Sequence, residues 1–135
     1  VDGVALSDWS PEEFQSRARD SVAEHGDASY AATRTLLGRL KYNRGDYGDP
    51  QTYEALRTAL GGARHPLHYL AIPPSQFGTI VEGLGRSGSA DNARVVVEKP
   101  FGRDLASARE LSATLHTVFD ESAVFRIDHY LDKEA

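Results

Sequence analysis

Residues 94–102 read RVVVEKPFG, and they are the clearest signal of the fold class in this sequence. Three consecutive valines without polar alternation are typical of a strand buried on both faces, as the strands of parallel sheets are. The run ends in the charged pair Glu98-Lys99, and Pro100 and Gly102 then fit a rigid, tight turn. A helix signal follows at once, because Asp104 can cap a run whose apolar residues recur about every 3.6 positions. The stretch therefore predicts a strand, a turn and a helix, the repeating unit of a parallel α/β sheet.

The same unit recurs along the chain. Further helices are expected to begin at Pro11, with Ser10 and Glu13 as a capping box, at Pro50 and near Pro74, and a less sharply bounded one spans residues 29–40. Short apolar runs lie between the helices, at residues 1–5, 40–43, 68–72 and 124–128. Alternating strands and helices predict a Rossmann-like, doubly wound parallel sheet in one domain over residues 1–135. Ligands of such folds bind outside the carboxyl ends of the strands.

The composition excludes several classes of protein. A net charge of -5 argues against nucleic acid as the main partner, because proteins that bind it usually display a basic face. The absence of cysteine removes disulfides and thiolate chemistry, so any redox step would depend on a cofactor. No apolar run approaches the about 20 residues that span a bilayer, so no membrane span is expected. The first residues lack the basic and then apolar stretches of a signal peptide, so none is expected there. The expected location is the cytoplasm.

A glycine pattern at residues 83–88, GLGRSG, matches the dinucleotide-binding fingerprint Gly-x-Gly-x-x-Gly. Its context is wrong, because a working fingerprint follows a strand and opens a helix, whereas this one closes a helix and precedes a strand. We interpret these glycines as a helix stop. The loop at residues 86–92, rich in Gly, Ser and Asp, is expected to be mobile.

Two motifs resemble one enzyme family. Residues 98–102 read EKPFG, and residues 126–134 read RIDHYLDKE. Together they resemble glucose-6-phosphate dehydrogenase, whose pattern is EKPFG followed by RIDHYLGKE; this chain has Asp132 in place of the glycine. The resemblance implies oxidation of glucose 6-phosphate at C1 to 6-phosphogluconolactone, the entry step of the pentose phosphate pathway. Hydride would pass to NADP or NAD, which supplies the redox step.

The resemblance also implies the roles of the residues in these motifs. Lys99 would contact both the sugar and the coenzyme, and Asp128 would orient a catalytic histidine that lies beyond residue 135. His129, Tyr130 and Lys133 would bind the phosphate of the substrate. The chemistry agrees, because a phosphate monoester carries about -1.5 to -2 charges near pH 7 and accepts strong charge-assisted hydrogen bonds.

Coenzyme contacts are expected at three further positions. Pro73 lies in the segment YLAIPP, residues 69–74, which resembles the family segment lining the coenzyme cleft. Asp46 and Tyr47, after the expected strand at residues 40–43, are expected to approach the adenosine. Leu6 stands where the family has an arginine that meets the 2′-phosphate of NADP. Leucine cannot pair with a phosphate, so the choice between NADP and NAD stays open.

The resemblance places residue 1 at the second strand of the coenzyme domain. The first strand, the phosphate-binding turn and the first helix would then be lacking, and we expect the chain alone to be inactive. Its open sheet edges are expected to be covered by a partner, as in a homo-oligomer. Two alternatives stay open: a non-catalytic module that binds a phosphosugar or another subunit, and a receiver or flavodoxin-like domain. The last shares the layers but leaves the cluster at residues 128–133 unexplained.

Overall fold

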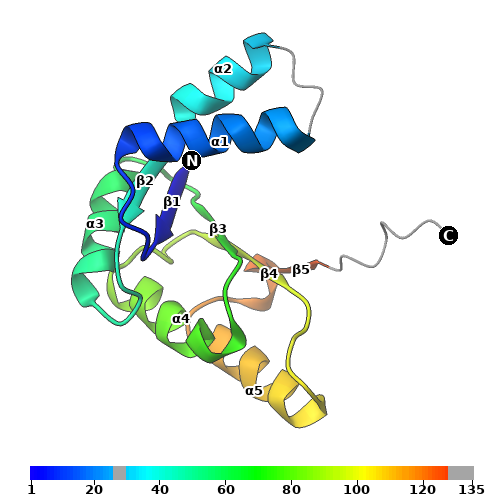
Figure 1. Ribbon diagram of the computed structural model, residues 1–135. Helices are drawn as coiled ribbons and strands as arrows, with labels where there is room; N and C mark the ends of the chain where they lie inside the picture. Colours follow the sequence, from blue (N-terminus) through cyan, green and yellow to red (C-terminus); the bar gives the residue numbers. More distant parts are fainter. Residues whose placement is uncertain (26–29, 128–135) are drawn as a thin grey trace, which may run out of the picture. The chain divides into compact units, whose positions relative to one another are not determined.

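The computed structural model describes residues 1–25 and 30–127 (Figure 1). It divides into two compact units, residues 1–59 and residues 60–135. Within the described residues every strand pairing is parallel, and helices connect the paired strands. The expected α/β class with parallel sheets is therefore confirmed. None of the described helices is both long and apolar enough to cross a membrane.

The first unit is built on a parallel pair of strands, in which Ala5 lies opposite Arg44. Its first helix begins as expected: the Ser10 amide donates to Glu13 Oε2 at 2.9 Å, and the Glu13 amide donates to Ser10 Oγ at 3.1 Å. This reciprocal pair satisfies two amides that the helix itself cannot. The elements of the unit are β1 (Asp2–Ala5), α1 (Pro11–His25), α2 (Tyr30–Arg39), β2 (Lys41–Arg44) and α3 (Pro50–Leu60).

An aromatic cluster packs α1 against the sheet of the first unit. The rings of Trp9 and Phe14 are stacked with centroids 6.3 Å apart, and the ring of Tyr42 on β2 lies 5.0 Å from Phe14. The hydroxyl of Tyr42 donates to the carbonyl oxygens of Ala5 at 3.0 Å and Ser7 at 2.6 Å. The phenol therefore ties β2 to the loop that leaves β1.

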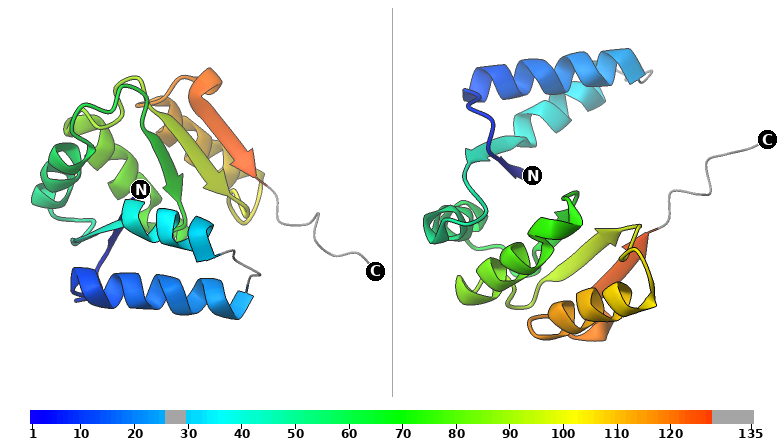
Figure 2. Two further views of the ribbon diagram at one scale, coloured as in Figure 1. Left: turned by 90° about the horizontal axis from the view of Figure 1, so that it is seen from above. Right: turned by 60° about the horizontal axis from the view of Figure 1, so that its bottom comes forward.

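The second unit has a three-stranded sheet in the order β3-β4-β5. Val95 and Val81 are fully buried, and Leu84 and Val97 are 2% exposed, so the expected buried strand at residues 94–98 is confirmed. Helices α4 and α5 lie along one face of this sheet (Figure 2). The elements are β3 (Leu67–Leu70), η1 (Pro74–Gln76), α4 (Phe77–Arg86), β4 (Arg94–Glu98), α5 (Leu105–His116), η2 (Glu121–Ala123) and β5 (Val124–Ile127).

The glycine pattern at residues 83–88 does close a helix, as interpreted, because α4 ends at Arg86 and Gly88 turns the chain with φ 76°. The loop that follows is more tightly bonded than its composition indicates. Ser89 is 1% exposed, and its carbonyl oxygen accepts a hydrogen bond of 2.7 Å from Nε2 of His68. Burial lowers the pKa of His68, which keeps the ring neutral. A sequence that resembles a flexible linker is here a part of the core.

Most element boundaries agree with the expectations to within about two residues. One difference is at β3, which ends at Leu70 although the expected strand continued to residue 72. Another is at α4, which begins at Phe77, three residues after Pro74, where the helix was expected to begin. Pro73 is extended, with φ -62° and ψ 144°, and the chain then makes a single 3₁₀ turn before α4. The Pro73 ring fixes φ and removes the amide donor, so the ladder cannot continue past this point. Nothing in the structure explains why the strand already ends at Leu70.

Candidate functional site

The turn after β4 is held against the beginning of α5. The peptide bond between Lys99 and Pro100 is cis, and Gly102 adopts φ 113°. A Cβ atom at Gly102 would lie 2.5 Å from the amide nitrogen of Ala108 and 2.7 Å from Oγ of Ser107. Only glycine allows both this φ and this approach of the turn to the helix. The position of Lys99 is therefore coupled to the first turns of α5.

The start of α5 is itself fixed by a capping box. The Ser107 amide donates to Asp104 Oδ1 at 2.8 Å, and the Asp104 amide donates back to Ser107 Oγ at 3.1 Å. The bond from the Ser107 amide is the first cause that lowers the pKa of the Asp104 carboxyl. The predicted cap at Asp104 is thus confirmed.

The carboxyl ends of β4 and β5 are joined next to Lys99. The Lys99 amide donates to the carbonyl oxygen of Ile127 at 3.3 Å, and Ile127 is the last residue that the structure describes. Ile127 is the second residue of the second motif, which begins at Arg126. The four residues of that motif for which roles are expected, Asp128, His129, Tyr130 and Lys133, lie outside the described residues.

A phenol and a carboxylate meet at the same edge of the sheet. The hydroxyl of Tyr69 on β3 donates a hydrogen bond to the carboxylate of Glu98 at the end of β4. This bond is the first cause that raises the pKa of Tyr69, so the phenol stays protonated as the donor. No local sequence pattern singles out this pair. The signal that could have found it is strand register, since Tyr69 lies opposite Val96, two residues before Glu98.

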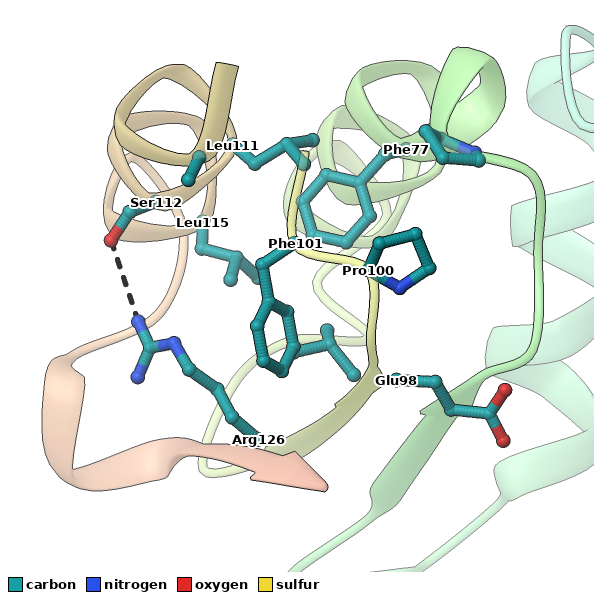
Figure 3. Close-up of a pocket in the computed structure, with 11 residues that line it drawn as sticks. Phe77, Glu98, Pro100, Phe101, Leu111, Ser112, Leu115 and Arg126 are labelled. Atoms are coloured by element: carbon teal, nitrogen blue, oxygen red, sulfur yellow. Dashed lines mark hydrogen bonds between the residues drawn. The ribbon is translucent and has the colours of Figure 1, made fainter. Parts of the chain in front are cut away.

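A small cleft of about 40 Å³ lies beneath the Lys99 turn (Figure 3). Figure 3 shows the guanidinium of Arg126 directed to Ser112, whose Oγ accepts at 3.4 Å, and the carboxylate of Glu98 directed away from it. Because one ordered water needs roughly 10–15 Å³ measured in this way, the cleft holds a few waters and not a sugar phosphate. It is a packing gap between the turn and α5. Its lining includes Pro74, Phe77, Pro100, Phe101 and Leu111.

Pro73 and Lys99 follow adjacent parallel strands, β3 and β4, and so lie at the same edge of the sheet in the second unit. Both residues are exposed. The structure thus brings together two of the four positions expected to contact the coenzyme. The other two, Asp46 and Tyr47, belong to the first unit.

Asp46 and Tyr47 form the turn from β2 into α3, and most of their polar groups serve the turn. The hydroxyl of Tyr47 donates to the carbonyl oxygen of Val4 at 3.0 Å, and the carbonyl oxygen of Tyr47 accepts from the Tyr53 hydroxyl at 2.7 Å. Burial, followed by the nearby Tyr47 and Asp46, raises the pKa of Tyr53 to about 12. Asp46 Oδ1 accepts from the Gly48 amide at 2.8 Å, and Asp46 is exposed to solvent.

The residues that follow β1 include an exposed leucine and one member of an ion pair. Leu6 is 61% exposed, so it does not pack in the interior. Two residues further on, Asp8 pairs with Arg44 at the end of β2, with 3.0 Å between Nη1 and Oδ1. No local sequence pattern predicts this pair, although the register of β1 and β2 could have indicated it. Across the described residues, no group of three or more histidine or carboxylate side chains is arranged to hold a metal ion.

Comparison with known proteins assigns the chain. Residues 1–135 match the sequence model of a family described as glucose-6-phosphate dehydrogenase, NAD binding domain. The chain belongs to the glucose-6-phosphate dehydrogenase family. The resemblance read from EKPFG and RIDHYLDKE is thereby confirmed. The expectation of NADP or NAD as the coenzyme is confirmed at the level of the domain, because the matched model is the NAD binding domain of the glucose-6-phosphate dehydrogenases.

Individual glucose-6-phosphate dehydrogenases are similar over nearly all of the chain. Glucose-6-phosphate 1-dehydrogenase 1 of Mycobacterium tuberculosis is 44% identical over 132 residues, which cover 98% of this chain and 28% of that protein. The Saccharomyces cerevisiae enzyme is 39% identical over 144 residues, with 98% of this chain and 28% of that protein covered. The chain thus spans less than a third of the length of these curated relatives.

Solved structures of glucose-6-phosphate dehydrogenases share the fold. The crystal structure of the Mycobacterium avium enzyme matches with a TM-score of 0.89 and 44% identity, covering 96% of this chain and 29% of that chain. A glucose-6-phosphate dehydrogenase in complex with its substrate glucose 6-phosphate matches with a TM-score of 0.81 and 35% identity, covering 98% of this chain and 30% of that chain. The Rossmann-like class is confirmed by these neighbours as well as by the strand pairing.

Proposed function

We propose that the intact protein carrying this chain oxidises glucose 6-phosphate at C1 to 6-phosphogluconolactone and passes the hydride to NADP or NAD. One observation supports this proposal above the others. The main-chain bond from Lys99 to Ile127 sets the EKPFG turn directly beside the point where the chain enters the phosphate-binding motif. The two motifs of the family therefore begin at one edge of one sheet, where ligands of such folds bind.

In the proposed roles, each motif contacts a different part of the substrate. The Lys99 ammonium would orient the C1 end of the sugar, with the turn against α5 limiting its movement. His129, Tyr130 and Lys133 would supply donors of three kinds to the phosphate. Asp128 would accept a hydrogen bond from the catalytic histidine and so stabilise its charged form. The nicotinamide coenzyme, when bound, accepts the hydride from C1.

Coenzyme contacts are proposed at both units. Lys99 and Pro73 would face the nicotinamide side of the coenzyme from the edge of the second unit. Asp46 and Tyr47 would approach the adenosine. Because the Tyr47 hydroxyl already donates to Val4, we assign Tyr47 a contact through its ring and Asp46 the polar contact.

The proton of the C1 hydroxyl must go to a base, and the described histidines do not serve. His68 is buried and donates to Ser89 in the core. His116, at the end of α5, bonds to Glu121 at 2.5 Å. His65 precedes β3 and so lies towards the opposite edge of the sheet, and His25 lies at the end of α1. The base would therefore come from outside residues 1–25 and 30–127, as the family resemblance implies.

The wider organisation of the protein is also a proposal. Residues 1–135 would form part of the NAD(P)-binding domain and end at the phosphate-binding motif. A homo-oligomer in the cytoplasm, where sugar phosphates and nicotinamide coenzymes occur, remains our prediction. Within the described residues, β1 pairs only with β2, and β3 pairs with only one strand, β4. The main-chain groups on the other side of each strand are therefore available to further strands.

The test uses the intact protein with glucose 6-phosphate and either coenzyme, followed by the absorbance of the reduced nicotinamide. Lys99→Ala should lower kcat/KM by about 100-fold or more, as expected when a group that orients the reacting carbon is lost. Lys41→Ala removes an equal charge from the amino end of β2 and should leave kcat/KM unchanged. Binding of glucose 6-phosphate without any coenzyme reduction would instead favour the non-catalytic module.

A further inference from the structure

An exposed ion pair lies at the carboxyl ends of both strands of the first unit. Nη1 of Arg44 lies 3.0 Å from Oδ1 of Asp8, and the two side chains are 61% and 82% exposed. Arg44 is the last residue of β2, and Asp8 follows the last residue of β1 by three positions. The Gly45 amide also donates to the carbonyl oxygen of Ala5 at 3.0 Å, so the two strand ends are tied together.

The pair is not needed to hold the loop that carries Asp8. The Tyr42 hydroxyl already binds that loop through Ser7 at 2.6 Å and Ala5 at 3.0 Å. An ion pair as exposed as this one adds little stability, because water screens the charges and both side chains lose rotamer freedom. The structure therefore presents a positioned guanidinium and a positioned carboxylate that the fold itself does not require.

The carboxylate of Asp8 and the guanidinium of Arg44 match the two forms of the adenosine ribose, which carries a 2′-hydroxyl in NAD and a 2′-phosphate in NADP. In dinucleotide-binding folds a carboxylate after a strand accepts a hydrogen bond from the 2′-hydroxyl of NAD, and a nearby arginine accommodates the 2′-phosphate of NADP. A guanidinium can donate two parallel bonds to a phosphate, whereas a carboxylate repels it. Leu6, exposed beside the same strand end, can do neither.

We propose that Asp8 and Arg44 together read the 2′ position of the coenzyme, Arg44 by pairing with a 2′-phosphate and Asp8 by accepting from a 2′-hydroxyl. This inference rests on the proposed function, since it concerns the coenzyme of the same reaction. The pair makes the protein a dual-coenzyme enzyme: NADP must displace the Asp8 carboxylate from Arg44, and NAD leaves the ion pair intact.

The test measures binding without turnover. Isothermal titration calorimetry on the intact protein would use NADP, NAD, adenosine 2′,5′-bisphosphate and AMP as probes. Arg44→Ala should weaken NADP and the bisphosphate by about 10-fold or more, the loss expected for a charge-assisted pair, and leave NAD and AMP within about twofold. Asp8→Ala should act in the opposite direction, with NADP bound several-fold tighter and NAD several-fold weaker.

Two further variants control the result. Lys41→Ala removes the same charge from the other end of β2 and should not change the ratio of NADP to NAD affinity. Arg44→Lys keeps the charge but loses the two-pronged geometry, so it should fall between the wild type and Arg44→Ala. It also covers the case in which Arg44→Ala does not fold.

The outcomes separate the inference from the proposed function. A wild type that binds the coenzymes, with Arg44 variants that weaken all four probes equally or none of them, overturns the role of the pair and leaves the dehydrogenase assignment in place. A wild type that binds none of the four probes overturns both. A lower affinity for only the probes that carry a 2′-phosphate supports the inference.

Discussion

The two units of the chain are stabilised in different ways. The second unit buries Val81 and Val95 completely and leaves only 2% of Leu84 exposed. In the first unit no residue of α1 is buried, and the helix packs through the aromatic cluster instead. A turn mounted on a dense core is fixed in place, as the Lys99 turn is. A surface held by a few hydroxyls and rings tolerates new side chains, and the departure from the family at Leu6 occurs there.

The largest effect should come from removing core volume. Leu84→Ala should lower the free energy of unfolding of the second unit by about 3–5 kcal/mol, and Leu37→Ala in the first unit by about 2 kcal/mol, at the lower end of such substitutions. Amide hydrogen exchange on the intact protein resolves the two units separately. Equal losses at both leucines would show that the contrast in packing is wrong.

Alanine substitutions at two glycines should change the free energy of unfolding in opposite directions. Gly102→Ala forces a side chain into positive φ and into contact with α5, so the second unit should lose about 1–3 kcal/mol. Gly38→Ala, in α2 with no atom within 4 Å of the added methyl group, should gain about 0.5–1 kcal/mol. Denaturant unfolding measures both changes. Stabilisation by Gly102→Ala would contradict the close approach of the turn to α5.

Removing a tyrosine hydroxyl should destabilise the first unit more than the second. Tyr42→Phe removes the bonds to Ala5 and Ser7 and should cost about 1 kcal/mol, seen as faster amide exchange in β1 and β2. Tyr69→Phe is the matched change on β3. Its hydroxyl meets Glu98 in solvent, so exchange in the second unit should hardly change. A larger effect at Tyr69 would reverse the comparison.

The smallest expected effect is a change in Tm that depends on pH. The side chain of Arg126, followed by that of His116, lowers the pKa of Glu121 from 4.5 to about 2. The stabilisation from this carboxylate is present above pH 4.5 and disappears as the pH falls towards 2, because the unfolded chain takes up the proton first. Glu121→Gln should therefore lower Tm at pH 6 and approach the wild-type Tm at low pH. Glu110→Gln, at an exposed position of α5, is the control.

Local chemistry was predictable from the sequence. The capping boxes at Ser10 and Asp104 depend on residues only three positions apart, and both helices begin where expected. The strand at residues 94–98 was predicted with its observed bounds, since three buried valines and a following proline turn leave little choice. The rejection of the glycine fingerprint at residues 83–88 was also correct, because its place in the order of elements decides its role.

Contacts between distant segments were not predictable. Tyr69 meets Glu98, and Asp8 meets Arg44, only because the parallel strands pair in one register. Register depends on packing across the whole sheet, and a shift by one residue would turn each side chain to the other face. The burial of Ser89 was missed for a related reason, since its partner His68 lies 21 residues earlier in the chain.

The hydrogen bond between His68 and Ser89 has a consequence for protein engineering. The segment at residues 86–92 has the composition of a linker, and a peptide tag or a circular-permutation break would naturally be placed there. Because Ser89 is 1% exposed, an insertion would pull a core residue outwards together with the end of α4. The exposed segment at residues 61–65, which joins α3 to β3, is the better site for a label.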